Sequence, residues 1–400
     1  MQLKMLNELF KLNRALVGSG FDQALQVIKK ELPEMKIHKF NTGDDYGTWT
    51  IPYNWEVKDF YIKKDGKKLK DIQLVCGSWA IDKKVSLKEL KKHLFYDPER
   101  MNAIPYVYKY YEKDWGLTTT GNNYVALEEG EYEVLIDSEL SYGTLKIGEY
   151  IIPGDDREIL IMVHLDHPYQ ANDNLSGVDV AVRLAKGLKC KHTVRIVFVP
   201  ETIGSVVYAY TQDLSKIEFG ITLDMVGNDN TILMQQTFAE IEKINKAGTM
   251  AMSILSPMAY RKAPFRAPLG ADEYILNDPL VGVPTILFSR SPYKEYHSNL
   301  DTLDIIKEDK ILETVEIVKK TIKIIESDWT PKREFKGPLM RSRYGVQQLS
   351  KEENRKYDYF FYLMDGNRTL LDLCYACQLD YDKMNKLLNK IKKNGFIKSV

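Results

Sequence analysis

Apolar residues recur at helical spacing near the start of the chain. Residues 1–32 carry two such stretches on either side of a break at Gly18-Ser19-Gly20, and Pro33 follows the second stretch. Spacings of three and four residues place apolar side chains on one face of a helix, and a proline ends it. The pattern therefore predicts two amphipathic helices.

The pattern changes between about residues 48 and 140. Tyrosine and tryptophan become dense there, and short extended runs alternate with turns such as Lys64-Asp65-Gly66 and Glu128-Glu129-Gly130. Aromatic residues favour strands, and glycine beside polar residues favours turns. This composition predicts a β-rich unit in which residues 86–93 form a short helix.

From about residue 143 to 326, apolar runs typical of buried strands alternate with helical stretches. The strand runs are 159–163, 194–199, 220–225 and 285–288, and the helical stretches are 177–188, 205–212, 240–250 and 304–326. This alternation predicts an α/β fold, with a mostly parallel mixed sheet and helices on both faces. In such sheets, functional sites form at the carboxyl ends of the strands.

The C-terminal part has a different pattern again. We expect a linker at 328–333, then three helices from Ser350 onward and a short strand at 395–397, an arrangement that resembles a winged helix-turn-helix. The predicted domains are an α/β domain of residues 1–45 and 141–330, an inserted β-rich domain of 46–140, and a winged helix-turn-helix domain of 336–400.

Charge and cysteine content narrow the class of protein. The 56 basic and 56 acidic residues cancel, so no overall field attracts nucleic acid or membrane, although 336–400 holds 13 basic against 7 acidic residues. The four cysteines are too few for a disulfide framework, and no apolar run reaches the roughly 20 residues of a membrane span. We expect a cytoplasmic protein with no membrane partner.

Two features of the C-terminal domain have alternative interpretations. Cys374 and Cys377 have a zinc-like spacing but lie in a helical stretch, which predicts two buried thiols instead. Basic side chains along the last helix either enter a DNA groove or, more simply, form a solvated face; these are Lys383, Lys386, Lys390 and Lys393.

Five segments of the α/β region place metal-ligand residue types at strand ends or in loops. They contain His164-Leu165-Asp166-His167, Asn172-Asp173-Asn174, Pro200-Glu201, Leu223-Asp224 and Tyr296-His297. In an extended segment, side chains two positions apart share one side, so His164 and Asp166 face the same way. Imidazole and carboxylate groups are zinc ligands, and two zinc ions about 3.5–4 Å apart form a hydrolytic centre. The segments predict a site for one or two zinc ions.

These motifs, in this order, resemble the co-catalytic di-zinc aminopeptidases over about residues 143–326. The whole arrangement is similar to bacterial aminopeptidase-like domain proteins that are found with polysaccharide-biosynthesis genes and carry an inserted domain and a C-terminal winged helix. The resemblance implies an aminopeptidase-like fold. It also implies that His164 and Glu201 hold one zinc ion, that Asp224 and His297 hold the other, and that Asp173 bridges them.

The resemblance further implies that Asp166 orients His164 and that a glutamate just before the metal-binding glutamate acts as the base. Here that position is Pro200. Either Glu201 remains a ligand and the base is lost, or Glu201 is the base and one metal position is weakened. His167 is a candidate substitute as base or ligand, or simply a loop histidine that faces solvent. The candidate catalytic residues are therefore Glu201, Asp166 and His167.

Other side chains are candidates for substrate binding. Asp272 or Glu273 would hold a substrate amine or cap a helix. Arg290 would hold a substrate carboxylate or form a surface salt bridge, and Tyr296 lies beside the predicted ligand His297.

The leading hypothesis is a zinc-dependent, aminopeptidase-like hydrolase that cleaves an amide bond in a small peptide or other amide. A second hypothesis is an amide hydrolase acting on a modified sugar or another non-peptide substrate. A third is a catalytically silent sensor with a winged-helix effector. DNA binding and assembly into a homo-oligomer are further partner hypotheses.

Overall fold

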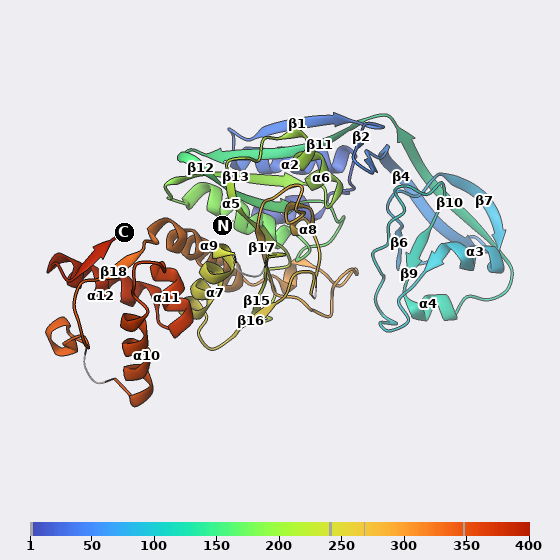
Figure 1. The fold of residues 1–400 in the computed structure, drawn as a ribbon. Coiled ribbons are helices and arrows are strands. Elements are labelled where there is room, and N and C mark those ends of the chain that lie inside the picture. Colours follow the sequence, from blue (N-terminus) through green and yellow to red (C-terminus); the bar gives the residue numbers. More distant parts are fainter. Residues whose placement is uncertain (1–2, 240–241, 268, 347–348) are drawn as a thin grey trace.

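The computed structural model describes residues 3–239, 242–267, 269–346 and 349–400. An eight-stranded sheet forms its centre, in the order β1–β11–β13–β12–β14–β17–β15–β16 (Figure 1). The strands are β1 (Lys36–Asn41), β11 (Thr144–Ile152), β13 (His192–Val199), β12 (Asp155–His164), β14 (Ile217–Leu223), β17 (Thr285–Ser289), β15 (Ile232–Gln235) and β16 (Tyr260–Ala263).

The four central strands, β13, β12, β14 and β17, run parallel. Strands β1 and β11 join their neighbours antiparallel, and β15 is antiparallel to β17 but parallel to β16. The predicted mixed α/β sheet is therefore confirmed. Sequence analysis missed strands β1, β11, β15 and β16. The exposed and half-buried pattern of β1 contains no long apolar run, because this strand lies at an edge of the sheet.

Strand β12 shows why the central strands are apolar throughout. Ile159, Ile161 and Val163 pack into one core cluster, while Leu160 and Met162 pack into the cluster on the opposite face. All five side chains are buried. A strand covered on both faces has no solvent side, so its sequence shows no polar alternation.

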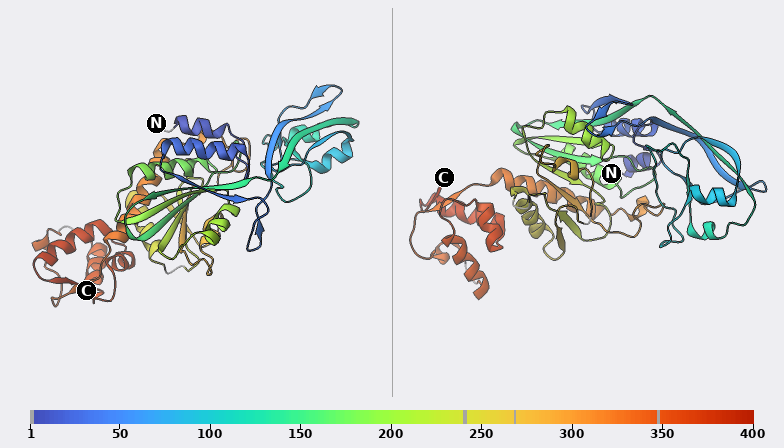
Figure 2. Two further views of the ribbon diagram at one scale, coloured as in Figure 1. Left: turned by 90° about the horizontal axis from the view of Figure 1, so that it is seen from above. Right: turned by 45° about the vertical axis from the view of Figure 1, so that its right-hand side comes forward.

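Helices cover both faces of the sheet (Figure 2). One core cluster takes side chains from α1 (Leu3–Phe10), α2 (Ser19–Glu31), α5 (Leu175–Gly187), α7 (Lys243–Leu255) and α9 (Glu308–Ser327). The other takes side chains from α6 (Ile203–Thr211) and α8 (Glu273–Leu276). The predicted helix 240–250 corresponds to α7, but its first two positions, Glu240 and Ile241, lie outside the described residues.

A second group of strands lies at one end of the molecule, opposite the C-terminal helices (Figure 1). It consists of a four-stranded sheet, β5–β4–β10–β7, and a three-stranded sheet, β6–β9–β8. Its elements are β4 (Asn54–Lys64), β5 (Lys67–Lys68), β6 (Ile72–Leu74), β7 (Ile81–Ser86), α3 (Leu87–His93), β8 (Leu94–Phe95), β9 (Leu117–Thr119), α4 (Gly121–Val125) and β10 (Glu131–Ser141). The short pair β2 (Asp45–Tyr46) and β3 (Trp49–Thr50) precedes them. These strands have their own apolar cluster, and we call residues 54–141 the β-rich unit.

The C-terminal part contains α10 (Lys351–Tyr362), α11 (Leu370–Cys377) and α12 (Tyr381–Lys393), after the short turn η2 (Arg341–Tyr344). The predicted linker is wrong in part, because residues 331–333 form strand β18 (Pro331–Arg333), which pairs with β19 (Ile397–Ser399). Cys374 and Cys377 are buried in α11, as the helical interpretation predicted.

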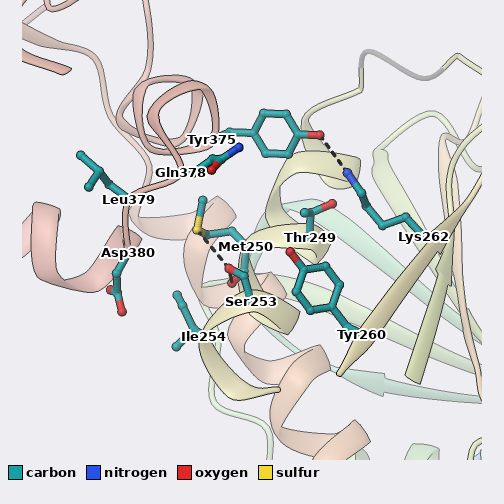
Figure 3. A pocket seen from close by; sticks show the side chains of 10 residues that line it. All are labelled: Thr249, Met250, Ser253, Ile254, Tyr260, Lys262, Tyr375, Gln378, Leu379 and Asp380. Atoms are coloured by element: carbon teal, nitrogen blue, oxygen red, sulfur yellow. Dashed lines mark hydrogen bonds between the residues drawn. The ribbon is translucent and has the colours of Figure 1, made fainter. Parts of the chain in front are cut away.

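A cavity of about 480 Å³ lies where the C-terminal helices meet α7 and β16 (Figure 3). Tyr375 on α11 and Lys262 on β16 face each other across it, with the ammonium group 3.4 Å from the phenol oxygen. None of the predicted zinc ligands lines this cavity. Within the described ranges, no helix combines the length and apolar character needed to span a bilayer.

Candidate metal centre

The predicted ligands come from neighbouring strand ends and the loops beside them. His164 is the last residue of β12, Asp224 directly follows β14, and Glu201 lies two positions after β13. Asp173 lies in the turn before α5, and His297 lies in the loop after β17. Because β12, β13 and β14 are parallel neighbours, their carboxyl ends meet at one edge, as the sequence suggested.

Three imidazole rings converge on the carboxylate of Asp173. The Nε2 atom of His164 and the Nδ1 atom of His167 each lie 2.9 Å from Oδ1 of Asp173. The Nε2 atom of His297 lies 3.1 Å from Oδ2 of Asp173. Asp173 is only 1% exposed, so its carboxylate lies at the buried centre of the cluster.

Two further carboxylates flank these rings. Oδ1 of Asp224 lies 3.7 Å from Nε2 of His164, and Oε2 of Glu201 lies 3.1 Å from Nε2 of His167. The resemblance implied that Glu201 shares a metal with His164, but the geometry groups His164 with Asp224. Glu201 instead lies beside His167.

Several buried atoms of the cluster have no hydrogen bond within the described structure. They are Nδ1 of His167, Nε2 of His297 and Oδ1 of Asp224. The two nitrogen atoms are close to Asp173 but do not have hydrogen-bond geometry toward it. Buried polar atoms normally have partners, and a cation between these atoms would supply one. Imidazole and carboxylate groups match the ligand chemistry of zinc, so the residues fit this metal.

The charges of the cluster point the same way. Burial raises the pKa of Asp224 well above its usual range. Burial opposes ionisation of Asp173 as well, but His167, His164 and His297 together hold its pKa well below the usual range. Acidic residues outnumber the three histidines, since Asp166, Glu201 and Asp272 lie here together with Asp173 and Asp224. A divalent cation would balance this excess.

His167 is buried, at 3% exposure, and the interpretation of this residue as a solvent-facing loop histidine is wrong. Its backbone has a positive φ of 80°. The guanidinium of the buried Arg14 donates to the carbonyl oxygens of His167 at 2.5 Å, Gln170 at 2.9 Å and Leu165 at 2.8 Å. Arg14 therefore holds the loop that turns His167 into the site. No local motif marked this arginine.

Asp301 holds the central ligand from the other side. Its carboxylate accepts the backbone N–H groups of Asn172 at 2.6 Å and Asp173 at 3.1 Å, and the hydroxyl of Tyr293 at 2.7 Å. Burial raises the pKa of Asp301 to about 6. Sequence analysis did not assign Asp301 a role, although it lies four positions after the predicted ligand His297.

Asp272 has neither of the roles predicted for it. It is 1% exposed, so it cannot receive a substrate amine, and its side chain makes no helix-capping hydrogen bond. Its Oδ2 atom lies 3.7 Å from Nδ1 of His164, and its Oδ1 atom accepts the N–H group of Thr202 at 3.0 Å. Asp272, rather than Asp166, is therefore the carboxylate beside the second nitrogen of His164.

Asp166 instead accepts the backbone N–H group of Glu201 at 2.7 Å. Its other oxygen lies 3.9 Å from Nε2 of His167. The predicted orientation of His164 by Asp166 is therefore wrong, and the contacts of Asp166 position Glu201.

Two of the predicted substrate-binding residues are structural. Glu273 is fully buried, and its carboxylate accepts the Ala271 N–H group and the Gln235 side-chain amide. Arg290 is 1% exposed and donates to Glu313 and to two backbone carbonyl groups, so neither substrate binding nor a surface salt bridge describes it. Tyr296 differs from both, because it is 37% exposed and its ring stacks on His297 with centroids 3.8 Å apart.

The β-rich unit adds a residue that sequence analysis did not place in the site. The ring of Tyr106 lies 5.1 Å from that of His167 and 5.4 Å from that of His297. Tyr106 belongs to the aromatic-rich stretch of the sequence, but its position beside two histidines depends on how the unit meets the central sheet.

Comparison with known proteins gives the same fold. A Clostridium acetobutylicum protein, named as a provisional polysaccharide biosynthesis protein with aminopeptidase-like domain, is 30% identical over 99% of this chain and 95% of its own length. The crystal structure of a provisional peptidase from Clostridium acetobutylicum has a TM-score of 0.86 at 28% identity, and it covers 99% of this chain and 95% of that one.

A zinc aminopeptidase from Bacillus subtilis has a TM-score of 0.60 at 12% identity, with 80% of this chain and 94% of that chain covered, which confirms the aminopeptidase-like fold. Residues 3–328 match a family profile described as a domain of unknown function, DUF4910. With that match over most of its length, the chain belongs to the DUF4910 family.

Proposed function

We propose that this protein is a zinc-dependent hydrolase of aminopeptidase type that cleaves an amide bond. The observation that carries the proposal is the convergence of His164, His167 and His297 on the buried carboxylate of Asp173, with several nitrogen and oxygen atoms left unpaired. The zinc aminopeptidase with the same fold supports the choice of metal.

We assign the ligands to two groups that share Asp173. His164 and His167 also lie close enough to each other to share a cation with Asp173. His164 and Asp224 would hold one zinc ion, and His167 and His297 would hold the other. Each of two histidines then directs its second nitrogen toward a carboxylate, His164 toward Asp272 and His167 toward Glu201. Carboxylates in this position fix the orientation of a ligating imidazole.

Zinc bound here would act as a Lewis acid and bring the pKa of a coordinated water to about 7. Glu201 is the carboxylate placed to move the proton. Its side chain is 27% exposed, whereas those of Asp173 and Asp224 are 2% and 7% exposed. Although burial opposes ionisation, His164 and His167 lower the pKa of Glu201, so its carboxylate is ionised near neutral pH. Position 200 is a proline instead of the glutamate that the resemblance implies as the base. If His167 is a metal ligand, Glu201 need not be one and can act as the base.

Metal analysis of the purified full-length protein tests the proposal. We expect one or two zinc ions per chain, and a large loss of zinc in Asp173→Ala. At saturating zinc, Glu201→Gln should lose turnover by about 10²–10⁴-fold, the usual contribution of a general base, and it should weaken zinc binding far less than Asp173→Ala does. A wild-type protein that binds no zinc, or an Asp173→Ala variant with unchanged zinc content, contradicts the proposal.

A second candidate substrate is an amide on a modified sugar. Asp272, Glu273 and Arg290 are buried, so none of the predicted charged groups is free to hold a peptide amine or carboxylate. The exposed side of the site instead carries the ring of Tyr296, which is 37% exposed. Tyr108, which is 59% exposed, lies beside Tyr106 with ring centroids 6.0 Å apart. Aromatic faces suit the apolar face of a sugar ring, and the relative's name refers to polysaccharide biosynthesis. Hydrolysis of aminoacyl amides, with none of N-acylated sugars, would contradict this candidate.

We also propose that residues 46–140 form an inserted domain and that residues 336–400 form a winged helix-turn-helix. The separate apolar cluster of the β-rich unit supports the first statement. The three C-terminal helices and the β18–β19 pair support the second. Expression of residues 329–400, which include the paired strand β18, tests the latter: a cooperatively folding fragment is expected, and an unfolded one would contradict it.

A further inference from the structure

The β-rich unit contacts the loop that carries His297 along its backbone. Pro105 and Ser298 form an antiparallel bridge. The N–H group of Tyr106 donates to the carbonyl oxygen of His297 at 2.9 Å, and the N–H group of Asn299 donates to the carbonyl oxygen of Ile104 at 3.0 Å. These backbone contacts lie at the candidate ligand and at the two residues after it.

Side chains reinforce this contact. The Oδ1 atom of Asn299 accepts the Ile104 N–H group at 2.8 Å, so Ile104 and Asn299 are joined in both directions. The guanidinium of Arg100 donates to the carbonyl oxygens of Lys294 at 2.8 Å and Tyr296 at 2.7 Å. An ion pair with Asp97, at 2.6 Å, fixes the guanidinium itself.

His297 needs such support for two reasons. Its φ is 50°, in the left-handed region that residues other than glycine rarely adopt. Its side chain is also 28% exposed, whereas that of His164, which ends a central strand, is 2% exposed. His297 therefore has less packing to hold it than the ligand that belongs to the sheet.

We infer that residues 100–106 of the β-rich unit complete the metal centre by holding the His297 loop, so that one of two zinc positions depends on this unit. The inference rests on the proposed function. Arg100 and Asn299 are positioning residues, because they act through His297. The zinc position formed by His164 and Asp224 does not use this contact.

Zinc affinity of the full-length protein, measured by competition with a chelator, tests the inference in four variants. Asn299→Leu removes the acceptor for the Ile104 N–H group, and Asn299→Asp keeps an oxygen acceptor. Arg100→Ala removes the donors to the loop carbonyl groups. Arg157→Ala is the matched control, because Arg157 also pairs with a nearby aspartate, Asp155, but lies at the other end of β12.

We expect Asn299→Leu and Arg100→Ala to weaken one zinc site about 10- to 100-fold, as loss of an outer support does, and to leave the other unchanged. Asn299→Asp and Arg157→Ala should stay within about threefold of wild type, well below that effect. Unchanged affinity of both sites in Asn299→Leu and Arg100→Ala overturns the inference. Equal weakening of both sites in a folded Arg100→Ala protein also overturns it.

A second measurement does not need zinc and separates this inference from the proposed function. In metal-free protein, hydrogen exchange at the amides of Tyr106 and Asn299 should be protected in wild type and faster in Arg100→Ala. If wild type binds no zinc but its amides are protected and exchange faster in Arg100→Ala, the proposed function is contradicted. The inference that the β-rich unit holds the His297 loop is then still supported. If wild type binds zinc and exchange at these amides is equally fast in both proteins, the inference fails and the proposed function stands.

Discussion

Nδ1 of His167 lies 2.9 Å from Oδ1 of Asp173. The same ring meets Glu201 through its other nitrogen. We therefore predict that His167→Gln weakens zinc binding by more than about 100-fold, beyond the usual effect of losing an outer support. Chelator competition measures the change, with His38→Gln as a control at the edge strand β1. Wild-type affinity in His167→Gln would show that this ring is not a ligand.

Asp272 lies behind His164, with Oδ2 3.7 Å from Nδ1 of the ring. Asp272→Asn keeps the size of the side chain but removes the charge that orients and polarises the imidazole. We expect zinc affinity to fall about 10- to 100-fold, with little change in secondary structure. Asp278→Asn, on an exposed turn near α8, is a suitable control. Equal zinc affinity in both variants would contradict the assigned role.

Arg14 is fully buried and donates to four carbonyl oxygens, those of Leu9, Leu165, His167 and Gln170. Burial lowers its pKa to about 10, so the guanidinium remains charged near neutral pH. Arg14→Met removes this donor from all four acceptors. The carbonyl oxygens of Leu9 and His167 keep the backbone N–H groups of Leu12 and Gln170, and each buried group that is left unpaired costs about 1–3 kcal/mol.

We therefore expect Arg14→Met to lower the free energy of unfolding by at least about 3 kcal/mol in chemical denaturation. Arg14→Lys, which keeps a charge and fewer donors, should give an intermediate loss. Equal stability of Arg14→Met and wild type would show that the carbonyl groups find other partners.

Glu273 predicts a pH dependence of stability. Burial raises its pKa from 4.5 to about 7 in the folded protein. The folded state then binds this proton more tightly than the unfolded chain, so the stabilisation is complete below pH 4.5 and disappears as the pH rises through 7. Glu273→Gln cannot ionise and lacks this dependence.

Between pH 5 and pH 8, the unfolding free energy of wild type should fall by about 2–3 kcal/mol relative to Glu273→Gln. Denaturant titrations of both proteins at each pH measure this difference, and the other titrating groups are common to both. A difference that is constant with pH would contradict the assignment.

Sequence patterns could predict which candidate ligands come together, because their positions follow from local structure. His164 and Asp224 stand where buried apolar runs end, and parallel neighbours bring such ends together. The aminopeptidase-like fold followed from the same motifs. The contacts by which Asp272, Arg14 and Asp301 support the site could not be predicted, because each joins segments that are far apart in the sequence.

The predicted substrate-binding roles of Arg290 and Glu273 are wrong because both side chains are buried. Arg290 and Glu273 were candidates for substrate binding because charged side chains are usually exposed. In the structure each is enclosed with its own partners, Glu313 and Gln235 respectively. Each of these side chains is held by a partner that is distant in the sequence, and the residue type alone does not reveal such a partner. The DNA-binding and homo-oligomer hypotheses stay predictions.

The hydrogen bonds from the backbone amides of Asn172 and Asp173 to Asp301 have a consequence for biosynthesis. A ribosome adds residue 301 long after residue 173, so the growing chain carries most of the ligands before it carries the carboxylate that positions the central one. Domains generally fold as units during synthesis. Under the proposed function, the turn that carries Asp173 gains this support only after residue 301 has been added, so zinc loading would be a late step in maturation.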